Sequence, residues 1–264
     1  MKIAKNEDKT LSVRDKKAVP AVGTGRIAKA VPPPTAFRPR SVVQKNGLAS
    51  AKQPERRPRD AAATSDRILE AAIAEFAEHG YAGARIDAIA QRADANMRML
   101  YHYFGSKNDL YLCVLEKVFE RIRLKEQKLN LKSLAPLPAM MKLFDLTYEH
   151  FGSNPLFIRI LTNENLLDGR FLTRSVRVSS LSSPLLIAMK EVLRRGEKEG
   201  VFRRGIDPLQ LYVSMVAMSY FHISNGPTLS HLFSANLSAG RWRNERRRHA
   251  SEMLEAYLTS GLKS

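Results

Sequence analysis

The stretch from residue 68 to residue 110 decides the fold. It begins Ile68-Leu-Glu-Ala-Ala-Ile-Ala-Glu-Phe76 and ends Leu100-Tyr-His-Tyr-Phe-Gly-Ser-Lys-Asn-Asp-Leu110. Apolar residues in its first part recur at every third or fourth position, which is the period of a helix with one buried face. Thr64 or Ser65 is expected to cap this helix, and Gly80 to end it.

Two shorter helices are expected to follow. The second carries its apolar residues on one face, at Ile86, Ile89, Ala90 and Ala93. The run Asp94-Ala95-Asn96 then breaks the chain, and Asn96 can cap a third helix that runs to about Phe104. Three helices at this spacing, with a short turn before the third, predict a helix-turn-helix domain.

The third helix has two faces of different chemistry. Its core side is expected to carry Met97, Leu100, Tyr103 and Phe104. Its outer side is expected to carry Arg98, Tyr101 and His102, beside Arg85 and Lys107. Arginine and lysine bind phosphates or guanine edges, and tyrosine and histidine can donate to phosphate oxygens, so this face suits DNA. A solvated charged face is the alternative.

The stretch closely resembles the DNA-binding domain of the TetR family of one-component regulators, above all in Tyr101-His-Tyr-Phe-Gly-Ser-Lys107. The resemblance implies that the start of the second helix and the length of the third enter the major groove. The contact candidates are then Arg85, Asn96, Met97, Arg98, Tyr101 and His102. Lys107 matches the family's phosphate-contacting lysine.

The chain departs from the usual family pattern at four positions, which leaves its base-reading rule open. They are Ala84 for a common hydroxyl residue, Asp94 for glycine, Asn96 for serine and Arg98 for a small residue. Arg98 could read a guanine through two hydrogen bonds or could hold a phosphate.

Charge is concentrated at the N-terminal end. The 264 residues carry a formal net charge of +17, and residues 1–59 hold 15 Lys and Arg against 4 Asp and Glu. Those residues also hold most of the prolines and one aromatic side chain, so they are expected to form a disordered basic tail. A DNA-touching arm and a plain solvated leader both remain open for it. The single cysteine, Cys113, excludes an intrachain disulfide and favours a reducing compartment.

The rest of the chain is expected to be helical, giving an all-α protein with a DNA-binding domain over residues 60–107 and a helical bundle over residues 108–264. Predicted bundle helices cover Asn108–Gln127, Pro138–Phe151, Pro155–Leu167, Pro184–Glu199, Pro208–Ser224, a piece after Thr228, and Asn244–Leu262. Pro208–Ser230 lacks charge and could span a membrane by length. Its polar residues and the run Asn225-Gly-Pro227 favour a buried helix, and no membrane partner is expected.

The family resemblance implies that the bundle binds a small effector and forms a homodimer through its last two long helices. The runs Asn163-Glu-Asn165 and Ser224-Asn-Gly-Pro-Thr-Leu-Ser230 resemble a subgroup that represses catabolic genes. Large or polar residues on apolar helices are the pocket candidates, although the aromatic pairs also fit core packing and His222 a satisfied core histidine. They are Phe144, Tyr148, Phe157, Leu161, Asn165, Met215, Ser219 and His222.

The arginine-rich run from Arg241 to Arg248 is expected to be a solvated face, with Trp242 anchoring a last helix that carries Met253, Leu254, Tyr257 and Leu258 toward the dimer partner. No nucleophile elbow, phosphate loop or zinc motif occurs, so neither an enzyme nor a cofactor or metal is expected.

The predicted function is a ligand-responsive repressor in the cytoplasm, associated with the nucleoid. It binds a palindromic double-stranded DNA operator and is released by an effector. Charge-driven, non-specific binding of nucleic acid through the tail is the alternative.

Overall fold

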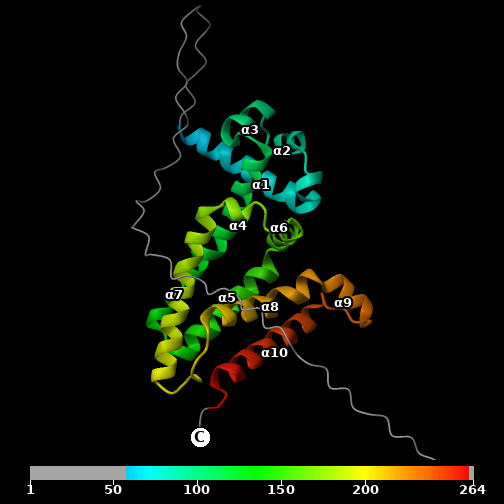
Figure 1. Ribbon diagram of the computed structural model, residues 1–264. Coiled ribbons are helices and arrows are strands. Elements are labelled where there is room, and N and C mark those ends of the chain that lie inside the picture. The colour runs from blue at the N-terminus through cyan, green and yellow to red at the C-terminus, as the bar shows by residue number, and fades with distance from the viewer. Residues whose placement is uncertain (1–57, 262–264) are drawn as a thin grey trace, which may run out of the picture. The chain divides into compact units, whose positions relative to one another are not determined.

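The computed structural model describes residues 58–261, which are helical and contain no strand (Figure 1). The predicted all-α class is confirmed. Two 3-10 turns, Leu131–Ser133 and Leu172–Arg174, precede α5 and α7. The helices are α1 (Pro58–Gly83), α2 (Ile86–Arg92), α3 (Met97–Phe104), α4 (Lys107–Gln127), α5 (Pro136–Ser153), α6 (Pro155–Leu166), α7 (Val176–Lys198), α8 (Pro208–Ser224), α9 (Gly226–Leu232) and α10 (Gly240–Thr259).

Three helix starts differ from the sequence prediction. α1 begins at Pro58, so Thr64 and Ser65 lie inside the helix; proline suits a first turn because its missing N–H would be unpaired there. α7 begins at Val176, where the Ser175 side chain accepts a hydrogen bond from the Val178 amide, and it continues through Pro184. α10 begins at Gly240, so the arginine-rich run is helical. The predicted tail lies outside the described residues except for its last two.

The turn between α2 and α3 has the predicted caps. The Asn96 side chain accepts a hydrogen bond from the Met99 amide at 2.8 Å, which fixes the start of α3. Asp94 has a φ of 48°, in the left-handed region that glycine favours and that aspartate tolerates better than most residues. The helix-turn-helix geometry therefore survives the Asp94 departure from the family pattern.

Two hydrophobic clusters form the core. The first joins the helix-turn-helix to α4, α6 and the end of α5, and includes Phe76, Leu100, Tyr111 and Ile160. The second joins α5, α7, α8 and α10. α1 to α3 thus share one core with α4 and α6.

A hydrogen bond links α6 directly to α1. The Asn163 side-chain amide donates to the backbone carbonyl of Phe76 at 3.1 Å. The bond lies close to Gly80, whose φ of 67° breaks the regular path of α1 before residues 81–83 turn again. A Cβ on Gly80 would lie 3.6 Å from the Asn163 side-chain oxygen. The predicted stop at Gly80 is thus a kink inside α1.

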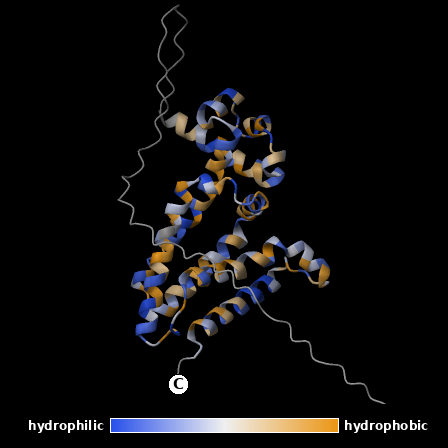
Figure 2. Cartoon of the chain, viewed as in Figure 1, coloured by the Kyte–Doolittle hydropathy of each residue, from blue (hydrophilic) through white to orange (hydrophobic). Residues whose placement is uncertain are grey.

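The uncharged segment Pro208–Ser230 is divided between α8 and α9 at Asn225. None of the helices that the structure describes is long and apolar enough to cross a bilayer. Figure 2 shows hydrophilic and hydrophobic residues interspersed along the helices, with hydrophilic residues gathered in the first half of α10.

Candidate DNA-binding surface and candidate ligand cavity

α3 presents an exposed polar face. Asn96, Arg98, Tyr101 and His102 are all exposed, whereas Leu100 is fully buried. Met97 was expected on the core side as well as among the contact candidates, and its 45% exposure corrects the core assignment. The reason is geometric: Met97 lies one turn before Tyr101, on the same outer face.

Arg85 precedes α2 and is exposed. Its guanidinium donates to both Asp87 side-chain oxygens, at 3.1 and 2.6 Å, which raises the pKa of Arg85 and lowers the pKa of Asp87. Its backbone N–H donates to the buried Glu75 carboxylate at 3.1 Å. Arg92 also lies 3.8 Å from Glu75. Glu75 on α1 therefore holds both ends of α2.

Lys107, at the first turn of α4, faces the protein. Its ammonium donates to the carbonyls of Ala84 at 2.6 Å and Ala82 at 3.3 Å, and lies 5.1 Å from the centre of the Tyr81 ring. Burial lowers the pKa of Lys107. Ser106 caps the helix by accepting from the Asp109 amide, as expected. Lys107 thus ties α4 to the turn between α1 and α2.

The eight predicted effector residues do not meet around one cavity. Phe144, Tyr148 and Met215 belong to the second core cluster, whereas Phe157 and the half-buried Leu161 belong to the first. Asn165 is exposed on α6, because the turn of the helix places its neighbour Glu164 in the core instead. Helical periodicity places a residue on a face but does not say which other helix covers that face.

Ser219 and His222 on α8 are buried, and both have partners. The Ser219 hydroxyl donates to the Met215 carbonyl of its own helix. His222 stacks on Tyr148, with its Nε2 atom 3.2 Å from the tyrosine hydroxyl. Burial, with Arg246 and Arg243 nearby, lowers the pKa of His222 to about 4. The ring of Trp242 lies 5.8 Å from it, so Trp242 anchors α10 on its own chain.

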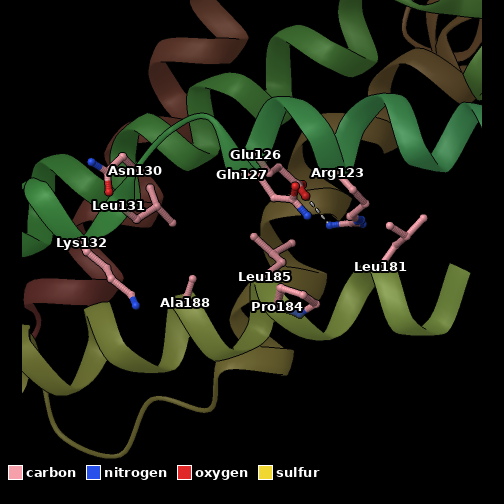
Figure 3. A pocket seen from close by; sticks show the side chains of 10 residues that line it. All are labelled: Arg123, Glu126, Gln127, Asn130, Leu131, Lys132, Leu181, Pro184, Leu185 and Ala188. Atoms are coloured by element: carbon pink, nitrogen blue, oxygen red, sulfur yellow. Dashed lines mark hydrogen bonds and ion pairs between the residues drawn. The ribbon is translucent and has the colours of Figure 1, made fainter. Parts of the chain in front are cut away.

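A cavity of about 340 Å³ lies between α4 and α7. Figure 3 shows side chains of α4 and of the segment after it facing those of α7. The volume is within the range of small-molecule sites. One wall is apolar and the other polar. The lining residues are Arg123, Glu126, Gln127, Asn130, Leu131, Lys132, Leu181, Pro184, Leu185 and Ala188.

The sequence reasoning missed this cavity, although α4 carried a signal for it. Leu115, Val118 and Ile122 form a buried stripe, and Arg123 and Glu126 continue it with charged side chains. Charged residues are almost never buried unless paired, so two of opposite sign in a buried register indicate an internal ion pair. No cluster suited to a metal ion is found among the described residues.

The fold and the exposed α3 face define a helix-turn-helix regulator with a helical sensor half. The model for "Bacterial regulatory proteins, tetR family" matches residues 68–114, and that for "Tetracyclin repressor-like, C-terminal domain" matches residues 136–254. The chain belongs to the TetR family. It is therefore a DNA-binding transcriptional regulator and not an enzyme.

Curated relatives share most of their length with the chain. The transcriptional repressor NicS of Pseudomonas putida is 33% identical over 182 residues, covering 69% of this chain and 86% of that protein. The transcriptional regulator RutR of Escherichia coli is 28% identical over 188 residues, covering 71% and 87%. The solved TetR-family regulator PfmR of Thermus thermophilus has the same fold, with a TM-score of 0.53, 23% identity, and coverage of 75% and 100%.

Proposed function

We propose that this protein is a repressor that binds a palindromic operator as a homodimer and releases it when a small molecule occupies the helical bundle. The observation that carries the proposal is the exposed face of α3, whose start is fixed by the Asn96 cap. The match to NicS, a named repressor, supports repression rather than activation. Residues 60–107 would contact DNA, and residues 108–264 would bind effector and dimerise.

The proposed DNA contacts are those of the exposed face, with Arg85 and Lys107 at its edges. They are Arg85, Asn96, Met97, Arg98, Tyr101, His102 and Lys107. Arg85 is already held by Asp87, and Lys107 by two carbonyls, so either would have to exchange its present partners for a phosphate. Arg98 has no ion-pair partner within residues 58–261 and can turn to a base without that cost.

Selection from fragmented genomic DNA at about 150 mM salt, where non-specific phosphate binding is weakened, tests the proposal. Full-length protein is compared with a copy that begins at Pro58, the first residue of α1. We expect both to recover one palindromic motif, and the genes beside it to indicate the effector. Recovery of DNA by the full-length chain alone, without a motif, would show that the basic tail is the binding element.

We expect the substitution Arg98→Ala to weaken operator binding by about 1–3 kcal/mol, the worth of one two-pronged contact to guanine. Arg98→Lys serves as the matched variant, because lysine keeps the charge but cannot form that fork. Titration of labelled operator at several salt concentrations is the measurement. With about eight phosphate contacts per dimer, log K should fall against log salt with a slope near −7, unchanged in Arg98→Ala. A slope shallower by about one, with full rescue by lysine, would assign Arg98 to a phosphate instead.

A further inference from the structure

A buried ion pair borders the cavity between α4 and α7. The Arg123 guanidinium donates to the Glu126 carboxylate at 2.6 Å, and the two side chains are 7% and 2% exposed. Arg123 also donates to the Tyr212 hydroxyl at 2.8 Å, from α8. Breaking such a pair costs more than breaking a surface pair, since water cannot replace the lost partner.

The pair is incompletely satisfied. The Arg123 Nε atom and the Glu126 Oε1 atom are buried and have no hydrogen-bond partner. Buried polar groups in folded proteins are almost always paired, so an unpaired donor and acceptor beside a cavity are unusual. Their position indicates that the site is completed by a molecule with polar atoms.

The remaining walls restrict what that molecule can be. Leu181, Pro184, Leu185 and Ala188 give α7 an apolar wall, which suits a small hydrocarbon or aromatic body. Lys132 adds a second cation to the lining, against one carboxylate. The excess of positive charge favours an anion, and the planar guanidinium of Arg123 binds a carboxylate through two parallel hydrogen bonds.

We propose that this cavity binds a small organic acid whose carboxylate pairs with Arg123 in place of Glu126, which takes up one proton from solvent. The proton neutralises the displaced Glu126 carboxyl, so the charge of the cavity is unchanged by binding. The inference rests on the proposed function, because occupation of this cavity is taken to be the event that releases the operator.

The surroundings of Glu126 favour its protonation. Burial raises the pKa of Glu126 to about 7, although Arg123 opposes the rise. The charged or titratable groups around the pair are Arg123 on α4 itself, Lys132 from the segment after α4, and Tyr212 from α8. His150 on α5 also senses Arg123, and the residues of α7 that line the cavity are uncharged.

This proton uptake gives the affinity a defined pH dependence. Above pH 7 the unliganded protein holds an ionised Glu126, so binding must add a proton, and affinity falls about tenfold for each further pH unit. Below pH 7 Glu126 already carries the proton, so affinity is level until the added acid itself becomes protonated.

Isothermal titration of the full chain with benzoate and with hexanoate tests the proposal. Each titration is run at pH 6 and pH 8 in two buffers that differ in ionisation enthalpy, so that the proton count is measured directly. Benzamide, which has the shape of benzoate without its charge, is the neutral comparison. We expect at least one acid to bind more than tenfold tighter than benzamide, with uptake of about one proton at pH 8 and far less at pH 6.

Variants separate the roles of the two charges. Glu126→Gln is expected to keep acid binding and to lose proton uptake. The double variant Arg123→Met/Glu126→Met replaces the whole pair by apolar side chains, a change that is often neutral for stability, and is expected to lose acid binding. Lys128→Met, at the exposed C-terminal end of α4, is the matched control and should behave like the unchanged protein.

The proposal is overturned if neither acid binds, if benzamide binds as tightly as benzoate, or if the double variant retains acid binding. Operator affinity, measured on the same preparations, keeps this result distinct from the proposed function. Acid binding that needs Arg123 but leaves operator affinity unchanged would support the acid site and overturn its role in release. Operator binding without any acid binding would support the repressor and overturn the acid site.

Discussion

The substitution Val213→Asp is expected to convert the dimer into a monomer and to weaken operator binding by roughly 100-fold or more, because linked half-site contacts multiply affinity by about that factor. Val213 lies in the middle of an apolar row on α8. Leu209, Val213 and Phe221 are 51%, 55% and 56% exposed, and they recur on one side of the helix with Ala217 between them. A carboxylate there would have to be buried without a partner when two copies meet.

α10 adds to this surface. It contacts α8, and its Met253 and Tyr257 are 50% and 44% exposed. Leu254 and Leu258, which the sequence pattern grouped with them, are instead buried in the chain's own core. The proposed partner-facing side of α10 is therefore narrower than expected.

Sedimentation velocity and operator titration measure the effect of Val213→Asp. Leu124→Asp is the matched control, because Leu124 is 48% exposed but lies on α4. The control should remain a dimer with unchanged operator affinity. A dimeric Val213→Asp protein with full affinity would place the interface elsewhere.

Glu164→Ala is expected to lower the free energy of unfolding by about 4 kcal/mol, since it leaves two backbone donors without an acceptor at about 2 kcal/mol each. The fully buried Glu164 carboxylate accepts hydrogen bonds from the amides of Phe171 and Leu172, at 2.7 and 2.9 Å. These bonds fix the turn after α6. Phe171 then packs against Tyr81 and Tyr111, with ring centres 4.6 and 4.9 Å apart.

Urea unfolding followed by circular dichroism gives the free energy of both this variant and its control. Glu164→Gln keeps one side-chain oxygen as acceptor, so we expect a loss of about 1 kcal/mol, the worth of an ordinary hydrogen bond. Equal losses in the two variants would show that the backbone bonds contribute little and that bulk alone matters at this position.

The helix-turn-helix was predictable because its signals are local. The caps at Asn96 and Ser106, and the buried register of Leu100, are each decided within a few residues. The ligand cavity was not predictable in the same way. It depends on α7 lying against α4, residues far apart in sequence, and on Arg123 and Glu126 neutralising each other. Helix starts failed for a third reason, since prolines at residues 58 and 184 are compatible with helix at the first turn and, here, within it.

The core shared by α1, α4 and α6 limits how this regulator can be taken apart. A fragment ending at residue 107 would expose the faces of Ile68 and Phe76 that α4 and α6 now cover, and would lose the Asn163 bond to α1. The operator-reading half is thus not a free-standing cassette. A chimera that joins this helix-turn-helix to another family member's sensor would need the α4 and α6 surfaces transplanted with it, so operator choice and effector choice are inherited together through that seam.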